Sequence, residues 1–293
     1  MKTNHIIKNM AALALLATLN SQLSTAFAQG SLTPPGSPAP TMKTADQIEP
    51  RTPISSAPYT ITNSGSYYLT TNLTGYGDAI TIATNGVTLD LNGFTIYSSY
   101  NWGATGSGIL LKSGLSDITI INGHICGGIT NNGSGVYSGN GFGYGILYLG
   151  NPPANVVVSK VSVAGVYVDG INVGTGNATV VDACTVTTVG FHGITASIIK
   201  SSVATDCGYD AIDGDQVIDC RGISTGGANG ISASATAQNC YGKSSIGIGL
   251  VSSIAIGCIG YSTSGIGLQA TIANSCIIGS GTTNVTYHCN MPW

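Results

Sequence analysis

Five segments of the chain decide its fold: CTVTTVGFHGI (184–194), SVATDCGYDAI (202–212), CRGISTGGANGI (220–231), CYGKSSIGI (240–248) and CIGYSTSGI (258–266). Each begins with Cys or Ser, and the starting positions are 18, 18, 20 and 18 residues apart. Each ends with a small residue followed by Ile, and these Ile positions are 18, 19, 17 and 18 residues apart. Because two markers keep one period, the sequence predicts a structural repeat of about 18 residues.

The repeat unit contains short β-branched runs separated by Gly, Asn and Ser, and no helical periodicity follows residue 57. Such a unit cannot bury its apolar face alone, so successive units must stack as the coils of a solenoid, with parallel strands about 4.8 Å apart. The unit also recurs upstream with longer loops, at 87–93, 118–123 and 156–158. The predicted fold class is all-β, a single-stranded parallel β-helix of about nine coils. Its anchors are Leu91, Ile121, Val161, Cys184, Ser202, Cys220, Cys240, Cys258 and Cys276.

Alternation within each marker strand predicts which side chains face the core. Ile194 and Ala196 point inward and Thr195 points outward. The five cysteines occupy one column of the repeat together with Ser202, which favours buried, reduced thiols stacked from coil to coil. A spacing near 4.8 Å also leaves open a disulfide bond such as Cys220–Cys240.

The chain divides into four parts by composition. Residues 1–28 have the charged start, short apolar run and Ala-Phe-Ala site of a secretory signal peptide, and 29–56 form a Pro-rich arm or cap. The β-helix is predicted over 57–283, followed by a tail at 284–293. We expect an exported protein, secreted, extracellular or at the cell surface, with the periplasm as the other compartment and no membrane span in the mature chain.

Nine Lys and Arg against twelve Asp and Glu exclude a nucleic-acid binder. The oligomeric state is not predicted.

An acidic cluster is the first candidate site. Asp210, Asp213 and Asp215 lie close together in the sequence, and Asp213 and Asp215 are predicted to point outward about 6.6 Å apart. Stepping by one coil places Asp169, His192, Asp210 and Asn229 in one row, each two positions before the marker Ile. A second row contains Asn172, Thr195, Asp213 and Ser232.

Two chemistries fit such a cluster. For both of them the candidate catalytic residues are Asp169, His192, Asp210, Asp213 and Asp215. Inverting glycoside hydrolysis uses two carboxyl groups roughly 6.5–9.5 Å apart. Uronate β-elimination uses a base and a Ca²⁺ ion on carboxylates, so Ca²⁺ is the one cofactor under consideration; the metal ligands are not predicted. The alternative is structural, because Asp and Asn at β-helix corners bond to neighbouring backbone groups. Asp206 and Asp219 are assigned to that role.

A second candidate site is the loop-rich region 97–148. Its rings suit sugar binding because an aromatic face stacks on the C–H-rich face of a sugar. The alternative is that these rings cover the side of the β-helix. The predicted substrate-binding residues are Trp102, Tyr137, Tyr144 and, outside this region, Arg221.

Two segments, GVTLDLNGFTI (86–96) and ITIINGHI (118–125), resemble the right-handed parallel β-helix proteins of the pectate-lyase-like superfamily. The arm at 32–55 followed by GSYYLTTNLTG (65–75) is similar to exported bacterial β-helix repeat proteins. The resemblance implies a right-handed helix and an extracellular polysaccharide as partner. The Asn-Thr-Asp, Asp-Asp, Gly-His-Gly and Arg-Ile-Lys signatures of β-helix polygalacturonases are missing from the sequence. Two functions therefore stay open: a polysaccharide lyase or glycoside hydrolase, and a non-catalytic surface, matrix or adhesin-like protein.

Overall fold

The computed structural model describes residues 50–289, with side chains up to residue 286, all within the compact unit Glu49–Trp293. This range contains strands and no helix, so no helix in it could cross a membrane. The predicted signal peptide and residues 29–49 of the predicted arm lie outside the described residues. The strands are β1 (Thr52–Ile54), β2 (Tyr59–Ile61), β3 (Gly65–Leu69), β4 (Leu73–Gly75), β5 (Ile80–Ile82), β6 (Val87–Asp90), β7 (Thr95–Ser98), β8 (Ser107–Leu111), β9 (Ser116–Cys126), β10 (Gly128–Asn131), β11 (Tyr137–Asn140), β12 (Tyr144–Tyr148), β13 (Ala154–Val166), β14 (Ile171–Gly174), β15 (Val180–Asp182), β16 (Thr185–Val189), β17 (Ile194–Lys200), β18 (Val203–Cys207), β19 (Ile212–Ile218), β20 (Arg221–Ser224), β21 (Ile231–Gln238), β22 (Tyr241–Ser244), β23 (Leu250–Ile256), β24 (Ile259–Asn274) and β25 (Ile277–Cys289).

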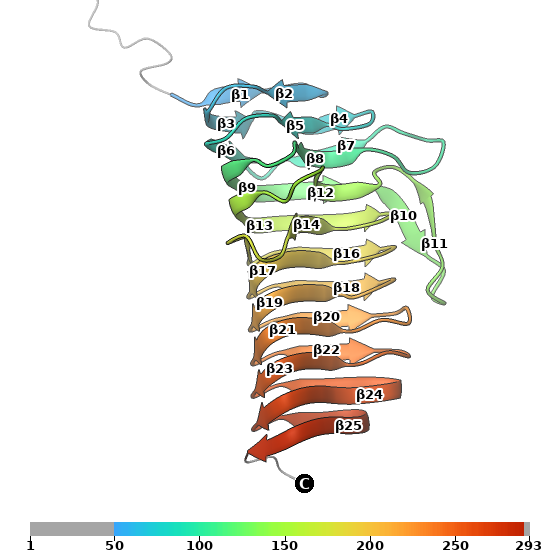
Figure 1. Cartoon of the computed structure of the whole chain (residues 1–293). Helices are drawn as coiled ribbons and strands as arrows, with labels where there is room; N and C mark the ends of the chain where they lie inside the picture. Colours follow the sequence, from blue (N-terminus) through green and yellow to red (C-terminus); the bar gives the residue numbers. More distant parts are fainter. Residues whose placement is uncertain (1–49, 290–293) are drawn as a thin grey trace, which may run out of the picture. The chain divides into compact units, whose positions relative to one another are not determined.

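The strands stack in three parallel columns, and the chain visits the columns in turn once per coil (Figure 1). The first column runs β1, β3, β6, β9, β13, β15, β17, β19, β21, β23, β24, β25. The second column runs β4, β7, β9, β13, β16, β18, β20, β22, β24, β25. The third column runs β2, β5, β8, β12, β14, β17, β19, β21, β23, β24, β25. This arrangement is a parallel β-helix, which confirms the predicted fold class.

The predicted count of nine coils is not confirmed, because the strands in each column outnumber the anchors. The N-terminal coils lack the cysteine column and have a longer period, so the 18-residue spacing does not detect them, although Ala79-Ile80 and Gly108-Ile109 carry the Ile marker in register with Ile146. β1, inside the range predicted as an arm, already pairs with β3. At the other end, β25 continues to Cys289, inside the range predicted as a tail.

The core is a stack of equivalent apolar side chains. Ile146, Ile171, Ile194, Ile212 and Ile231 follow one another in register, and each is fully buried. This register corrects two positions of the Ile marker: Leu250 and Leu268 continue the stack, whereas Ile248 and Ile266 lie two residues earlier. The predicted marker spacing therefore slips in the last two segments.

The cysteine column lies at the corner between the first and second columns. Cys184, Cys220, Cys240, Cys258 and Cys276 are buried free thiols, and Ser202 continues the column as a buried hydroxyl. Burial raises the pKa of the Cys184 thiol to about 11, so this side chain stays protonated and unreactive at neutral pH. The residue before each of these positions has a positive φ, which includes Asp219 at 53°. Asp219 therefore serves a turn, as predicted.

Candidate functional site

The predicted row of polar residues lies at the corner where the chain enters the third column, two positions before the buried Ile of five successive coils. We call it the corner row: Tyr144, Asp169, His192, Asp210 and Asn229. Backbone hydrogen bonds fix it, because the residue after each member donates its N–H to the carbonyl of the next: Gly145 N to Asp169 O (3.0 Å), Gly170 N to His192 O (2.9 Å), Gly193 N to Asp210 O (3.0 Å) and Ala211 N to Asn229 O (3.1 Å). The row thus includes Tyr144, which was predicted as a separate sugar-binding residue.

Asp169 and His192 form a hydrogen-bonded pair within the corner row. Asp169 is only 5% exposed. Its Oδ1 lies 3.3 Å from His192 Nδ1 and accepts the His192 backbone N–H at 3.2 Å, while its Oδ2 accepts the Asn172 side-chain N–H at 2.9 Å. The imidazole is therefore held at one nitrogen by a buried carboxylate.

Asp210 has a similar place one coil further along. Its side chain is also buried, and its Oδ1 accepts the backbone N–H of Asn229 at 2.6 Å. Burial raises the pKa of Asp210, and the charge of Asp213 adds to this.

The outward row of the third column contains Asn172, Thr195, Asp213 and Ser232, paired in register as predicted. Thr195 is on the predicted side of its strand but is 9% exposed, and its buried Oγ1 has no hydrogen-bond partner. Burial raises the pKa of Asp213, although His192 and the Ser232 hydroxyl oppose the shift. Thr195 is therefore buried where alternation alone predicts an exposed side chain, while Asn172, Asp213 and Ser232 are partly exposed.

His192 responds to the same cluster of charges. Burial lowers the pKa of His192, but the hydrogen bond and charge of Asp169 outweigh this effect. The charges of Asp210 and Asp213 act in the same direction, and the net result is a raised pKa. The ring therefore keeps its proton to a higher pH than an exposed histidine.

Asp215 lies at the next corner and is held by two donors. Its Oδ2 accepts the backbone N–H of Gly176 at 3.1 Å, and its Oδ1 accepts the Ser234 hydroxyl at 2.8 Å. Gly176 belongs to the loop between β14 and β15, so this loop reaches across to β19. Asp215 is close enough to Asp213 for their charges to interact.

No group of three or more His, Cys, Asp or Glu side chains in residues 50–286 is arranged to hold a metal ion. Within these residues the acidic cluster therefore offers a Ca²⁺ ion no set of three carboxylates.

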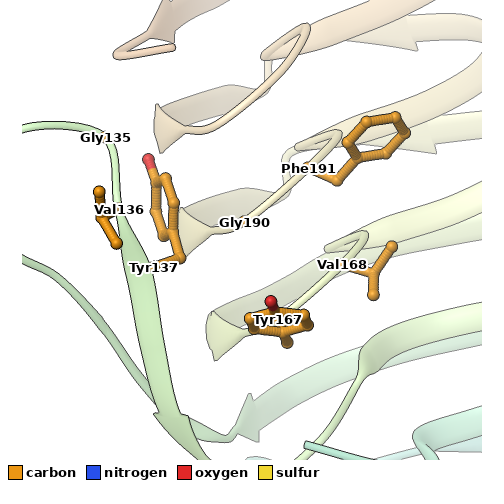
Figure 2. A pocket seen from close by; sticks show the side chains of 7 residues that line it. All are labelled: Gly135, Val136, Tyr137, Tyr167, Val168, Gly190 and Phe191. Carbon is orange, nitrogen blue, oxygen red and sulfur yellow. The ribbon is translucent and has the colours of Figure 1, made fainter.

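A hollow of about 510 Å³ is lined by residues of the β10–β11 hairpin and of two coils (Figure 2). Residues 135–137 of the β10–β11 hairpin line one side, and Tyr167, Val168, Gly190 and Phe191 line the other. A neighbouring hollow of about 280 Å³ shares Tyr137 and Tyr167 and also includes residues 103–104. The corner row lines neither of these two hollows.

The hairpin is fixed to the β-helix by Tyr137. Its hydroxyl lies 3.1 Å from Asp206 Oδ1 and 2.6 Å from Thr225 Oγ1. Asp206 has φ 56° and also accepts the side-chain N–H of Asn131, so it serves a turn and anchors the hairpin. Tyr137, which was predicted to bind sugar, lines both hollows and also anchors the hairpin.

Trp102 and Arg221 do not join the corner row. Trp102 is 85% exposed in the loop between β7 and β8, next to Gly103, which lines the smaller hollow. Arg221 lies in the second column with its guanidinium 5.6 Å from the ring centre of Tyr241.

Sequence reasoning missed three aromatic residues beside the corner row. Phe191 and Tyr209 stack with ring centres 4.6 Å apart, and the His192 ring lies edge-on to both, at 4.3 Å and 4.9 Å. Tyr167 is half exposed one coil earlier. The sequence pattern that could have revealed them is an aromatic residue one or two positions before a member of the corner row, repeated before Asp169, His192 and Asp210.

The chain matches no family model, no curated protein and no solved structure.

Proposed function

We propose that this protein is an exported enzyme of the pectate-lyase-like superfamily that processes an extracellular polysaccharide by acid–base chemistry, as a glycoside hydrolase. The observation that carries the proposal is the grouping of the Asp169–His192 pair and Asp210, all in the corner row, with Asp213 of the neighbouring outward row. Burial raises the pKa of both Asp210 and Asp213. Carboxyl groups that keep a proton beside others that stay ionised are what a general acid and a general base require.

The roles follow from the surroundings of each group. Asp213 is the acid that protonates the glycosidic oxygen, because its desolvated carboxyl keeps its proton to a higher pH. Asp215 is the carboxylate that activates water, because two donors hold it in place. His192, oriented by Asp169, assists.

A hydrolase is favoured over a lyase for two reasons. A lyase needs a cation at the uronate carboxyl group, and the described residues contain no metal-binding group of three acidic, His or Cys side chains. Pectate lyases, which the sequence resembles, use an arginine as the base, and here Arg221 lies in another column with its guanidinium over the ring of Tyr241.

The test is incubation of the purified protein with a panel of neutral and acidic glycans, with and without Ca²⁺, measured as new reducing ends. We expect the Asp213→Asn variant to lose roughly 10²–10⁴-fold in rate, the usual contribution of a general acid. Absence of product from every glycan would contradict the proposal.

A non-catalytic surface or matrix protein is the second candidate. It is favoured by the backbone bonds of the row, since Asp169 and Asp210 each accept an N–H from the next coil and so stabilise the corner. In that case Asp213→Asn changes no activity, and binding to a glycan array depends on Trp102 and its neighbouring tyrosines.

A further inference from the structure

We propose that the hollow under the β10–β11 hairpin is a sugar subsite that binds a neutral pyranose, adjoining the corner row at Phe191. The inference rests on the proposed function, because it assigns the substrate class of the same site. It also predicts the direction of the bound glycan. The glycan runs around one coil, from the hollow past Phe191 to His192, and not along the β-helix axis.

The first support is the construction of the hollow. Its volume of about 510 Å³ is within the range of small-ligand sites. Tyr137 lines the hollow from the hairpin and is held by Asp206 and Thr225, while Tyr167 and Phe191 line it from two successive coils (Figure 2). Aromatic side chains on both sides of a preformed hollow provide stacking faces at little entropic cost.

The second support is a platform of glycines below Tyr137. A Cβ atom added at Gly208 would lie 3.0 Å from Tyr137 Cε2, and one added at Gly190 would lie 3.4 Å from Tyr137 Cβ. The ring therefore lies directly on backbone without Cβ atoms. A larger residue at either position would displace the wall of the hollow.

The third support is charge, which decides between neutral and acidic sugars. The side chains that line the hollow are all uncharged, and the carboxylate of Asp206 is bonded to Tyr137. The neighbouring cluster adds further carboxyl groups. Three of the described cations are engaged elsewhere: Lys200 lies 3.6 Å from Asp182, Arg221 lies over Tyr241, and Lys243 lies over Tyr261. A uronate seated in the hollow would find no Lys or Arg in the lining to pair with, whereas a neutral sugar needs none.

The fourth support is continuity between the hollow and the catalytic groups. Phe191 lines the hollow, and its ring centre lies 4.3 Å from that of His192. Tyr209 extends the same aromatic surface toward the coil of Asp210. A sugar seated against Phe191 therefore has its neighbour in the glycan beside His192.

The experiment measures binding and hydrolysis separately, using the full-length protein. Cellohexaose, xylohexaose and mannohexaose serve as neutral probes and hexagalacturonic acid as the anionic probe, with dissociation constants from calorimetry. We expect at least one neutral probe to bind, and Tyr167→Ala and Phe191→Ala to weaken its binding about tenfold, which corresponds to 1.4 kcal/mol. Leu149→Ala is the control, because Leu149 is similarly exposed (48% against 49% for Tyr167), lies outside the region 97–148 and lines neither hollow.

The results separate the two proposals. If Tyr167→Ala weakens binding while wild-type protein and Asp213→Asn hydrolyse nothing, the subsite is supported and the proposed enzymatic function fails. If hydrolysis occurs but Tyr167→Ala and Phe191→Ala bind as tightly as wild type, the subsite is refuted and the enzyme stands. Tighter binding of hexagalacturonic acid than of every neutral probe, or no binding of any neutral probe, overturns the inference.

Discussion

Replacing Gly208 by Ala tests how tightly the coils approach at the corner that carries the hollow. An added Cβ would lie 2.2 Å from the carbonyl oxygen of Gly190 in the coil before. Carbon and carbonyl oxygen in ordinary contact are about 3.3 Å apart, so the two coils must separate here by about 1 Å. The hydrogen bonds from Gly208 N to Val189 O (2.9 Å) and from Tyr209 N to Phe191 O (3.0 Å) would then be lost or strongly lengthened.

The expected cost is about 3 kcal/mol of unfolding free energy, from two weakened hydrogen bonds of about 1 kcal/mol each and overpacking of at least about 1 kcal/mol. Gly227→Ala is the control, because a Cβ added there has no atom within 4 Å and its φ is not positive. This control should change stability by less than about 0.5 kcal/mol.

The assay combines urea unfolding, followed by circular dichroism, with native-state hydrogen exchange. In a solenoid each coil contacts only its neighbours, so Gly208→Ala should accelerate exchange in β16, β18 and β20 more than in β24. Equal urea midpoints for the Gly208 and Gly227 variants would refute the close approach of the coils. Faster exchange spread evenly over all coils would refute its local character.

Three further outcomes are expected. Burial raises the pKa of Asp213, so above the unfolded carboxyl pKa of about 3.9 the folded protein binds more protons than the unfolded chain and loses stability as pH rises. Asp213→Asn should therefore raise the melting temperature at pH 7 but not at pH 3. An equal effect at both pH values would contradict the raised pKa. Tyr137→Phe removes the hydroxyl that bonds to Asp206 and Thr225 and should cost about 1 kcal/mol in urea unfolding, whereas Tyr97→Phe should cost little. Thiol titration of the denatured, unreduced protein should find at least the seven free thiols of the described residues, and fewer would indicate disulfide bonds.

The stacking of equivalent residues was predictable because a parallel β-helix converts sequence period into spatial adjacency. Asn172, Thr195, Asp213 and Ser232 are neighbours only because each coil repeats the same path, and the strand pairing has them in the predicted register. Turn chemistry was also readable at Asp206, since Asp tolerates a positive φ.

The slip of the marker has a local cause. Each buried residue of the stack follows the cysteine column by ten or eleven positions, as Ile194 follows Cys184 and Leu250 follows Cys240. Because Leu replaces Ile at 250 while a Gly-Ile pair also occurs at 247–248, the pattern matched the wrong pair. Composition alone could not distinguish them, but the distance from the cysteine does.

Depth and long-range contacts were beyond the sequence. Alternation assigns Thr195 to the outer face but says nothing of the side chains and loops that cover that face, so its burial was missed. The bond between Tyr137 and Asp206 joins residues 69 positions apart and has no periodic signal. The hollow exists only because the hairpin folds back over later coils, which no local pattern encodes.

The placement of the hollow follows from where the β-helix tolerates insertions. The connections from β16 to β17 and from β18 to β19 are short turns, at 190–193 and 208–211, whereas 99–106 and 127–143 are long. The two long segments are joined, since Gly103 donates its N–H to Asn140 Oδ1 at 2.9 Å and Gly141 donates to the Gly103 carbonyl at 2.8 Å. A solenoid with only short turns has flat faces, so walls for a ligand must come from such insertions. The walls therefore occur beside Tyr167 and Phe191, and this is why we look for the substrate at that corner and not along the turns from β20 to β23.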